Sequence, residues 1–209
     1  MDVRNGEVLG VVSLPDFDPN LPTKIEPDRR FNRATLGVYE MGSTLKIFTT
    51  AMALDSGKVS MRDGYDATHP IRVSRFVIRD YHAKRRWLSV PEIFMYSSNI
   101  GSVKMLLDVG ITEQRAFLQK LGLLHPSPVE ISEIGAPLIP SPWRAINAMT
   151  ISFGHGLSIS PMQLVAGVAS MINGGLYHAP TFLKRRTDLK TKGRRVISLQ
   201  TSDHVRRLL

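Results

Sequence analysis

The sequence predicts an α/β fold of the α+β type, with a helical body and an incomplete antiparallel sheet of two or three strands. Several segments carry apolar residues at helical spacing between cap and stop residues, whereas runs of β-branched residues are few. The chain has 209 residues, 43% of them apolar, which suffices for a core that needs no metal or disulfide. We therefore expect one domain over residues 1–209.

The first predicted element is a β-hairpin at the N-terminal end. Residues 1–3 and the β-branched run 8–12 flank Asn5-Gly6, a dipeptide that supplies the positive φ angles of a tight turn. Residues 14–22 then contain three prolines, which block both a helix and a central strand. We expect an irregular connection there.

Three helices are predicted in the first two thirds of the chain. Residues 43–54 form a buried helix with Ser43 at its N-terminal end and a stop at Gly57. Residues 100–108 form a second helix, closed by Gly110. A third begins with Thr112 as its N-cap and ends at Gly122.

The remaining predicted elements follow a long loop over residues 124–142, which contains five prolines. Helical spacing resumes at 143–151. Ser160 and Pro161 open the helix with the clearest signals, because serine is a favoured N-cap and proline a favoured first helical residue. A last helix is predicted over 202–209, capped by Thr201 or Ser202.

The positive charge is concentrated in two segments. The chain has a formal net charge of +9, yet residues 72–86 hold six basic residues against one acid and residues 181–209 hold nine against two. Basic runs of this kind are most often solvated loops, and an anionic partner surface is the alternative. We expect no nucleic acid partner.

The composition also excludes several classes of protein. The chain has no cysteine, so a disulfide scaffold, a Cys-ligated zinc site and a thiol nucleophile are all excluded. It contains no apolar run long enough to cross a membrane, and its first residues do not form a signal peptide.

Ser43 and Lys46 are the candidate nucleophile and base. Three residues apart on a helix, they share one face, so the Lys46 amine can lie beside the Ser43 hydroxyl. A lysine activates a serine only if its pKa is depressed, and apolar Leu45 and Ile47 flank Lys46. The alternative is a helix-start serine followed by a surface lysine.

A second polar group lies fifty-one residues after Lys46, in Tyr96-Ser97-Ser98-Asn99. In an extended loop, Ser97 and Asn99 point into the same cleft. The alternative is that Ser98 or Asn99 only caps the helix that follows.

These residues resemble two of the three motifs of penicillin-recognising serine transpeptidases, S-x-x-K and S-x-N. Wider stretches, Tyr39-Glu40-Met41-Gly42 before the serine and the segment 151–164, are similar to class B penicillin-binding proteins. Within that class the chain is most similar to division-specific peptidoglycan D,D-transpeptidases. The resemblance covers essentially the whole chain and implies the penicillin-binding-protein/β-lactamase-like fold.

The resemblance also implies a mechanism and its partners. Ser43 would attack the D-alanyl-D-alanine bond of a stem pentapeptide and be acylated by β-lactams, with Lys46 as general base. Ser97 would relay a proton to the leaving nitrogen, and Asn99 would bind the substrate amide and help to fix Lys46. No cofactor is implied. The resemblance further implies a role in septal wall synthesis, with divisome partners that include a septal glycosyltransferase. It also implies an inner-membrane protein whose catalytic domain lies in the periplasm.

The third family motif, K-T-G, is not found in order. Lys190-Thr191-Lys192-Gly193 has similar letters within a basic loop, and we interpret this as coincidence. We therefore expect a transpeptidase domain truncated at both ends, without the membrane anchor, the N-terminal non-catalytic region and the K-T-G strands. Such a chain is expected to be weakly active or inactive by itself.

His155 is a further candidate for substrate binding, because flanking glycines let it approach a substrate. The alternative is a tight turn beneath the active site. The other histidines lack ligand spacing, so no metal site is expected; they are His69, His82, His125, His178 and His204.

Four other functions remain open on sequence grounds. An elongation-type transpeptidase, a serine β-lactamase and a β-lactam sensor all share the S-x-x-K chemistry, although oxacillin-hydrolysing β-lactamases typically end their second motif in valine where this chain has Asn99. A non-catalytic interaction module of the division complex is the fourth. Only this last function would survive mutation of Ser43.

Overall fold

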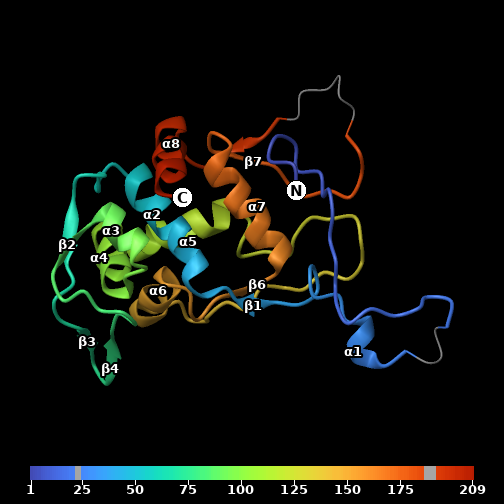
Figure 1. The fold of residues 1–209 in the computed structure, drawn as a ribbon, viewed down its shortest axis with the longest axis horizontal. Coiled ribbons are helices and arrows are strands. Elements are labelled where there is room, and N and C mark those ends of the chain that lie inside the picture. Colours follow the sequence, from blue (N-terminus) through green and yellow to red (C-terminus); the bar gives the residue numbers. More distant parts are fainter. Residues whose placement is uncertain (22–24, 186–191) are drawn as a thin grey trace.

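The structure is a computed structural model that describes residues 1–21, 25–185 and 192–209. Apart from the first short helix, its helices form one body in which segments distant in sequence pack together (Figure 1). In this described part the helices are α1 Pro27–Arg30, the 3-10 helix η2 Gly42–Leu45, α2 Lys46–Asp55, α3 Val90–Met95, α4 Asn99–Val109, α5 Ile111–Lys120, α6 Ala145–Ser152, α7 Pro161–Ile172 and α8 Leu199–Leu208.

The strands are short and pair antiparallel, two by two. The pairs are β1 Tyr39–Glu40 with β6 Ser158–Ile159, β2 Gly64–Asp66 with β5 Trp87–Ser89, β3 Ile71–Val73 with β4 Phe76–Ile78, and β7 Leu176–Tyr177 with β8 Arg194–Arg195. Helices with small antiparallel strand pairs confirm the predicted α+β class. The expected number of two or three strands is wrong, because the described residues form four separate pairs.

The helix α2 lies at the centre of the core. It packs against α4, α7 and α8, and every residue from Lys46 to Leu54 is buried. Two apolar clusters meet on it, one reaching α4 and the other reaching α7 and α8. Burying a large side chain contributes about 1.5–3 kcal/mol, so these contacts hold the start of α2 firmly in place.

Local signals explain most helix ends. Ser160 and Gln163 form a capping box that confirms the predicted start of α7. The Ser160 hydroxyl oxygen accepts from the Gln163 backbone N–H, and the Gln163 side-chain oxygen accepts from the Ser160 backbone N–H. The helix α3 is a short element that the sequence analysis missed. Its signal is a capping box between Ser89 and Glu92, with Pro91 in the first turn.

The predicted N-terminal hairpin is wrong. Asp2 and Glu7 do close a turn through Asn5-Gly6, but residues 8–12 form no strand. Within the described residues this segment is bridged only at Glu7, to Thr181. A β-branched run is a strand only where a partner satisfies its backbone, and here Leu9 and Val12 are exposed.

Two helix caps were also assigned to the wrong residue. The N-cap of α5 is Gly110, with φ +119°, and Thr112 is an exposed residue inside the helix. The helix α8 begins three residues before the predicted start, because Ser198 accepts the backbone hydrogen bond from Thr201. In both cases a second good capping residue stood within four positions, and packing selected the other one.

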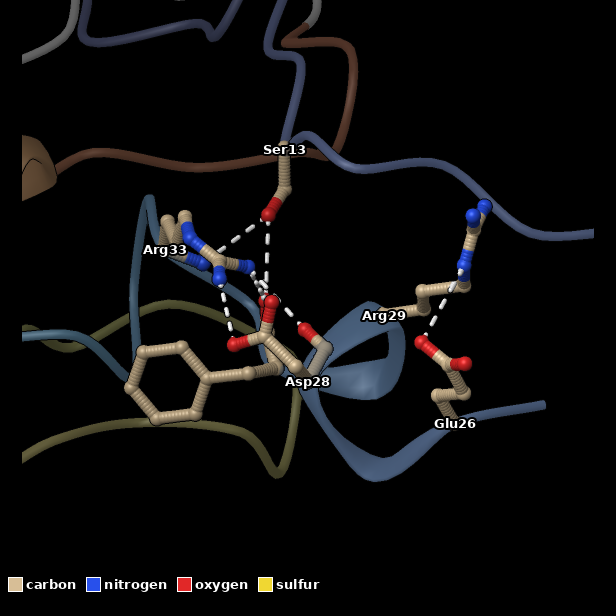
Figure 2. Close-up of polar contacts among 6 residues, drawn as sticks. Ser13, Glu26, Asp28, Arg29 and Arg33 are labelled. Atoms are coloured by element: carbon tan, nitrogen blue, oxygen red, sulfur yellow. Dashed lines mark hydrogen bonds and ion pairs between the residues drawn. The ribbon is translucent and has the colours of Figure 1, made fainter.

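The segment before β1 extends to one side of the body. In Figure 1, α1 lies at the opposite end of the molecule from β3 and β4. Figure 2 shows how the segment is held: Arg33 pairs with Asp28 at 2.6 Å and donates its backbone N–H to the Ser13 hydroxyl at 3.0 Å. These exposed pairs each contribute less than about 1 kcal/mol.

Parts of the basic C-terminal segment lie outside the described residues. Among them are Arg186, which follows Lys184 and Arg185, and Lys190 and Thr191, which begin the segment compared with the K-T-G motif. In the ranges that are described, no helix is both long and apolar enough to cross a bilayer.

Candidate active site

The predicted nucleophile lies where η2 runs into α2. Ser43 is exposed in the 3-10 turn, and Lys46 is the first residue of α2, with only 3% of its surface exposed. Gly42 has φ +56°, a conformation that glycine adopts without strain, and it turns the chain from β1 into η2. The serine is thus open to solvent while the lysine points into the protein.

The Lys46 amine joins Ser43 to Ser97. Its Nζ donates to the Ser43 Oγ at 3.2 Å, to the Ser97 Oγ at 2.8 Å and to the Ser97 carbonyl. The Ser97 hydroxyl in turn donates to the Ser43 Oγ at 3.0 Å. Two hydroxyls and one amine therefore form a closed triangle that the sequence analysis predicted only in part.

Burial changes the chemistry of this lysine. Desolvation lowers the pKa of Lys46 to about 8, because a charged ammonium is disfavoured away from water. The negative charge of Asp80 acts in the opposite direction and is the smaller effect. A substantial fraction of Lys46 is therefore neutral near physiological pH and able to accept a proton.

A strained turn brings Ser97 to the lysine. Ser97 lies between α3 and α4 with φ +55°, a left-handed conformation that is uncommon for a residue with a side chain. Ser98 caps α4 by accepting from the Gly101 N–H at 2.9 Å. Asp80 fixes the turn from outside, accepting from the Ser98 hydroxyl and from the Ile100 N–H.

Asn99 is oriented differently from the expectation that it helps to fix Lys46. Its amide nitrogen donates to the Arg79 carbonyl at 2.8 Å. The three donors of the Lys46 ammonium are already used by Ser43 and Ser97, so the lysine is held by the Ser97 backbone and hydroxyl instead. The role of Asn99 in binding substrate stays a prediction. Of Ser98 and Asn99, the two residues expected as alternative caps of α4, Ser98 is the N-cap.

His155 lies in a glycine-flanked turn packed against the nucleophile turn. Its Nδ1 is 3.1 Å from a Glu40 carboxylate oxygen, and the other oxygen accepts from the Gly156 N–H at 2.6 Å. Gly42 donates its N–H to the Gly154 carbonyl at 3.2 Å. The backbone hydrogen bond from Gly156 lowers the pKa of Glu40, and the bond from His155 acts in the same direction. Substrate binding by His155 stays a prediction.

Two residues of the site were missed by the sequence analysis. Glu40 stands three residues before Ser43 and holds the 154–156 turn in place. Asp80 is the only acid within the basic segment 72–86, and that isolation was the available signal of a structural partner. No cluster of three or more His, Asp or Glu side chains that could hold a metal is found in the described part of the chain.

Comparisons with known proteins agree with this geometry. The family model described as "Penicillin binding protein transpeptidase domain" matches residues 1–209. The chain is 38% identical over 208 residues to a probable peptidoglycan D,D-transpeptidase FtsI of Caulobacter vibrioides, covering 100% of this chain and 35% of that protein. It is 29% identical to the peptidoglycan D,D-transpeptidase FtsI of Escherichia coli K12, covering 94% of this chain and 33% of that protein.

Solved structures show the same fold. The transpeptidase domain of Burkholderia pseudomallei penicillin-binding protein 3 is similar with a TM-score of 0.87 and 29% identity, over 100% of this chain and 59% of that one. A Burkholderia ambifaria structure described as a peptidoglycan glycosyltransferase is similar with a TM-score of 0.88 and 28% identity, over 100% and 62%.

The chain spans about a third of the length of the curated relatives it matches. The family model nevertheless covers every residue, and the predicted penicillin-binding fold is confirmed by the structural matches. The chain belongs to the family of penicillin binding protein transpeptidase domains.

Proposed function

We propose that this chain carries the nucleophile, the base and the proton relay of a serine-type peptidoglycan D,D-transpeptidase. One observation carries the proposal: a buried lysine with a pKa of about 8 contacts the hydroxyls of Ser43 and Ser97 together. The names of the relatives as peptidoglycan D,D-transpeptidases support the reaction. The substrate is then a stem peptide that ends in D-alanyl-D-alanine, and β-lactams are its mimics.

Acylation begins with Ser43, the more exposed of the two hydroxyls. Its Oγ bonds to the carbonyl carbon between the two D-alanines, while its proton passes to neutral Lys46. The negative charge that develops on the carbonyl oxygen is stabilised by the Ser43 backbone N–H in the first turn of η2. The C–N bond then breaks, and the Ser97 hydroxyl protonates the leaving nitrogen and regains a proton from Lys46.

Transfer completes the cycle. The amine of a second stem peptide attacks the ester carbonyl and gives up a proton to neutral Lys46, a new amide bond forms, and Lys46 passes that proton to the leaving Ser43 oxygen. We assign to Asn99 the binding of the substrate backbone. Its amide nitrogen is held by Arg79, and its carboxamide oxygen is the group that accepts a substrate N–H.

The septal role is the finer part of the proposal. The similarity to two FtsI proteins supports work in septal wall synthesis beside a glycosyltransferase and other divisome proteins. It also supports a place at the inner membrane with the catalytic domain in the periplasm. A fluorescent fusion of the full-length gene product is expected at the division site; uniform labelling of the cell periphery would favour the elongation alternative.

The acylation rate is expected to depend on pH through Lys46. Its folded pKa is lowered, so the neutral base increases as pH rises through about 8. Between pH 6 and 7 the rate constant for acylation by a penicillin should rise about tenfold, and it should level off above pH 8 to 9. Stopped-flow measurement across this range checks the profile, and a flat profile contradicts the assignment of the base.

The same shift makes a prediction for stability. Between the folded pKa of about 8 and the unfolded value of 10.5, the unfolded chain binds more protons, so stability gains from Lys46 as pH rises through that window. The penalty of the buried charge is fully present below pH 8.

Release of D-alanine tests the proposal as a whole. The full-length gene product is expected to release D-alanine from a stem pentapeptide and to join two stem peptides, and Ser43→Ala should do neither. Ser56→Ala is the matched control, because among the described residues the Ser56 hydroxyl bonds only the Ala53 carbonyl and the Lys58 N–H, at the far end of α2. Fast hydrolysis of β-lactams without cross-linking would favour the β-lactamase alternative, and intact function in Ser43→Ala the interaction module.

A further inference from the structure

A pocket outside the catalytic triangle lies next to the turn that carries Ser97. It has a volume of about 640 Å³. Two connections build it, one between β2 and β3 and the other between β4 and β5, and Ile100 of α4 closes it. The first connection contributes residues 67–70 and the second contributes Arg79, Asp80, Tyr81, Ala83 and Arg85.

The pocket is lined by cations whose charge the described protein does not neutralise. Arg79 and Arg85 are exposed, and within the described residues neither guanidinium has a hydrogen bond or an ion pair. His69 adds a third basic group to the lining. Arg79 and Arg85 belong to the basic segment 72–86, whereas His69 precedes it.

The one acid in the lining is already engaged. One Asp80 oxygen accepts from the Ser98 hydroxyl at 2.8 Å and the other from the Ile100 N–H at 2.9 Å. Both partners belong to the first turn of α4, whose partial positive charge offsets the carboxylate. The guanidinium groups are therefore left to attract an anion from outside.

The pocket and the catalytic site share a wall. The Arg79 carbonyl accepts from Asn99, and Asp80 holds Ser98. A peptide chain that extends from the catalytic site past Asn99 would therefore meet residues that line the pocket. Arg85 has φ +51°, a left-handed conformation like that of Ser97, and such conformations gather at ligand sites.

We propose that this pocket binds a carboxylate of the peptide substrate, at a position remote from the D-alanyl bond that Ser43 attacks. The inference rests on the proposed function, which makes the ligand a peptide. A guanidinium group fits a planar carboxylate, which accepts two parallel hydrogen bonds from it. The exposed ring of Tyr81, 91% accessible, offers an apolar surface for the stem beside it.

The test compares two substrates and two double variants of the full-length gene product. Both substrates are stem pentapeptides with a free terminal D-alanine carboxylate; the side-chain carboxylates are free in one and amidated in the other. R79Q/R85Q removes both cations from the pocket. R62Q/R72Q removes the same charge from exposed positions outside the pocket.

The ratio of kcat/KM for the free acid over the amide is the readout. A charge-assisted hydrogen bond gives a preference of about tenfold, which we expect in the wild type and in R62Q/R72Q. In R79Q/R85Q the ratio should fall to about one, mostly through KM. A preference that persists in R79Q/R85Q, or is absent from the wild type, overturns the inference.

Failure of the proposed function gives a different result. If a fluorescent penicillin does not acylate Ser43 in the wild type, the transpeptidase proposal fails and this inference fails with it. If Ser43 is acylated but no carboxylate preference exists, only the pocket has been misassigned.

Discussion

Replacing Lys46 by methionine is expected to slow acylation of Ser43 by about a thousandfold. A positioned general base contributes roughly 10² to 10⁴ to a rate, and this amine also holds Ser97 in place. Methionine fills similar space without a charge, so the buried site stays packed. The rate constant for labelling by a fluorescent penicillin measures the loss.

The same variant should be about as stable as the wild type at pH 7, because the removal of a buried charge offsets the loss of three hydrogen bonds. Burial lowers the pKa of Lys46, so the charged amine destabilises the fold below pH 8, and Lys46→Met removes that penalty. Lys58→Met is the control, since Lys58 is exposed beyond the C-terminal end of α2 and, among the described residues, its ammonium donates only to the Val109 carbonyl. A Lys46→Met protein that acylates at the wild-type rate would show that another group is the base.

Gly154→Ala is expected to disrupt the nucleophile turn. A Cβ at this position would lie 1.8 Å from the Gly42 carbonyl oxygen, in a backbone with φ +109°. Gly42 directly precedes Ser43, so relief of the clash is expected to shift the nucleophile turn and to disturb the contact of Ser43 with Lys46. We expect a loss of several kcal/mol of stability, more than the 1–3 kcal/mol of backbone strain alone, and little acylation. Urea unfolding and penicillin labelling measure the two effects.

Gly57→Ala is the control that separates the effect of backbone strain from the effect of a steric clash. Gly57 also has a positive φ, +71°, but nothing lies within 4 Å of the Cβ position. It should lose only about 1–2 kcal/mol and keep the acylation rate. Equal effects of the two substitutions would mean that the contact between Gly154 and Gly42 does not position the serine.

Local signals in the sequence predicted a secondary-structure element correctly where they agreed with the tertiary packing. The helix α7 has a serine cap, a proline in its first turn and an apolar face, and the structure places it there. The run 8–12 had equally good strand residues, but a strand depends on a partner that can be distant in sequence. The predicted N-caps of α5 and α8 were wrong because several nearby residues could each serve as the cap.

The site was predictable to the extent that it is local. Ser43 and Lys46 are three residues apart on one helical segment, so their contact follows from helix geometry. The contact of Lys46 with Ser97 depends on the packing of α2 against the α3–α4 turn. The family resemblance placed Ser97 in the same site but led us to expect Asn99 as the residue that fixes Lys46. The supports at Glu40 and Asp80 act across 115 and 18 residues of sequence, respectively. The isolation of Asp80 among basic residues marks it as a candidate, but no local pattern identifies the partners of either carboxylate.

Mapping the acylated residue tests the central claim most directly, because two hydroxyls contact the lysine. The full-length gene product is treated with a penicillin, digested and analysed by tandem mass spectrometry. The proposed mechanism predicts one adduct, on the peptide that contains Ser43, with Ser97 unmodified. An adduct on Ser97, or a folded protein without any adduct, would contradict the assignment of Ser43 as the nucleophile.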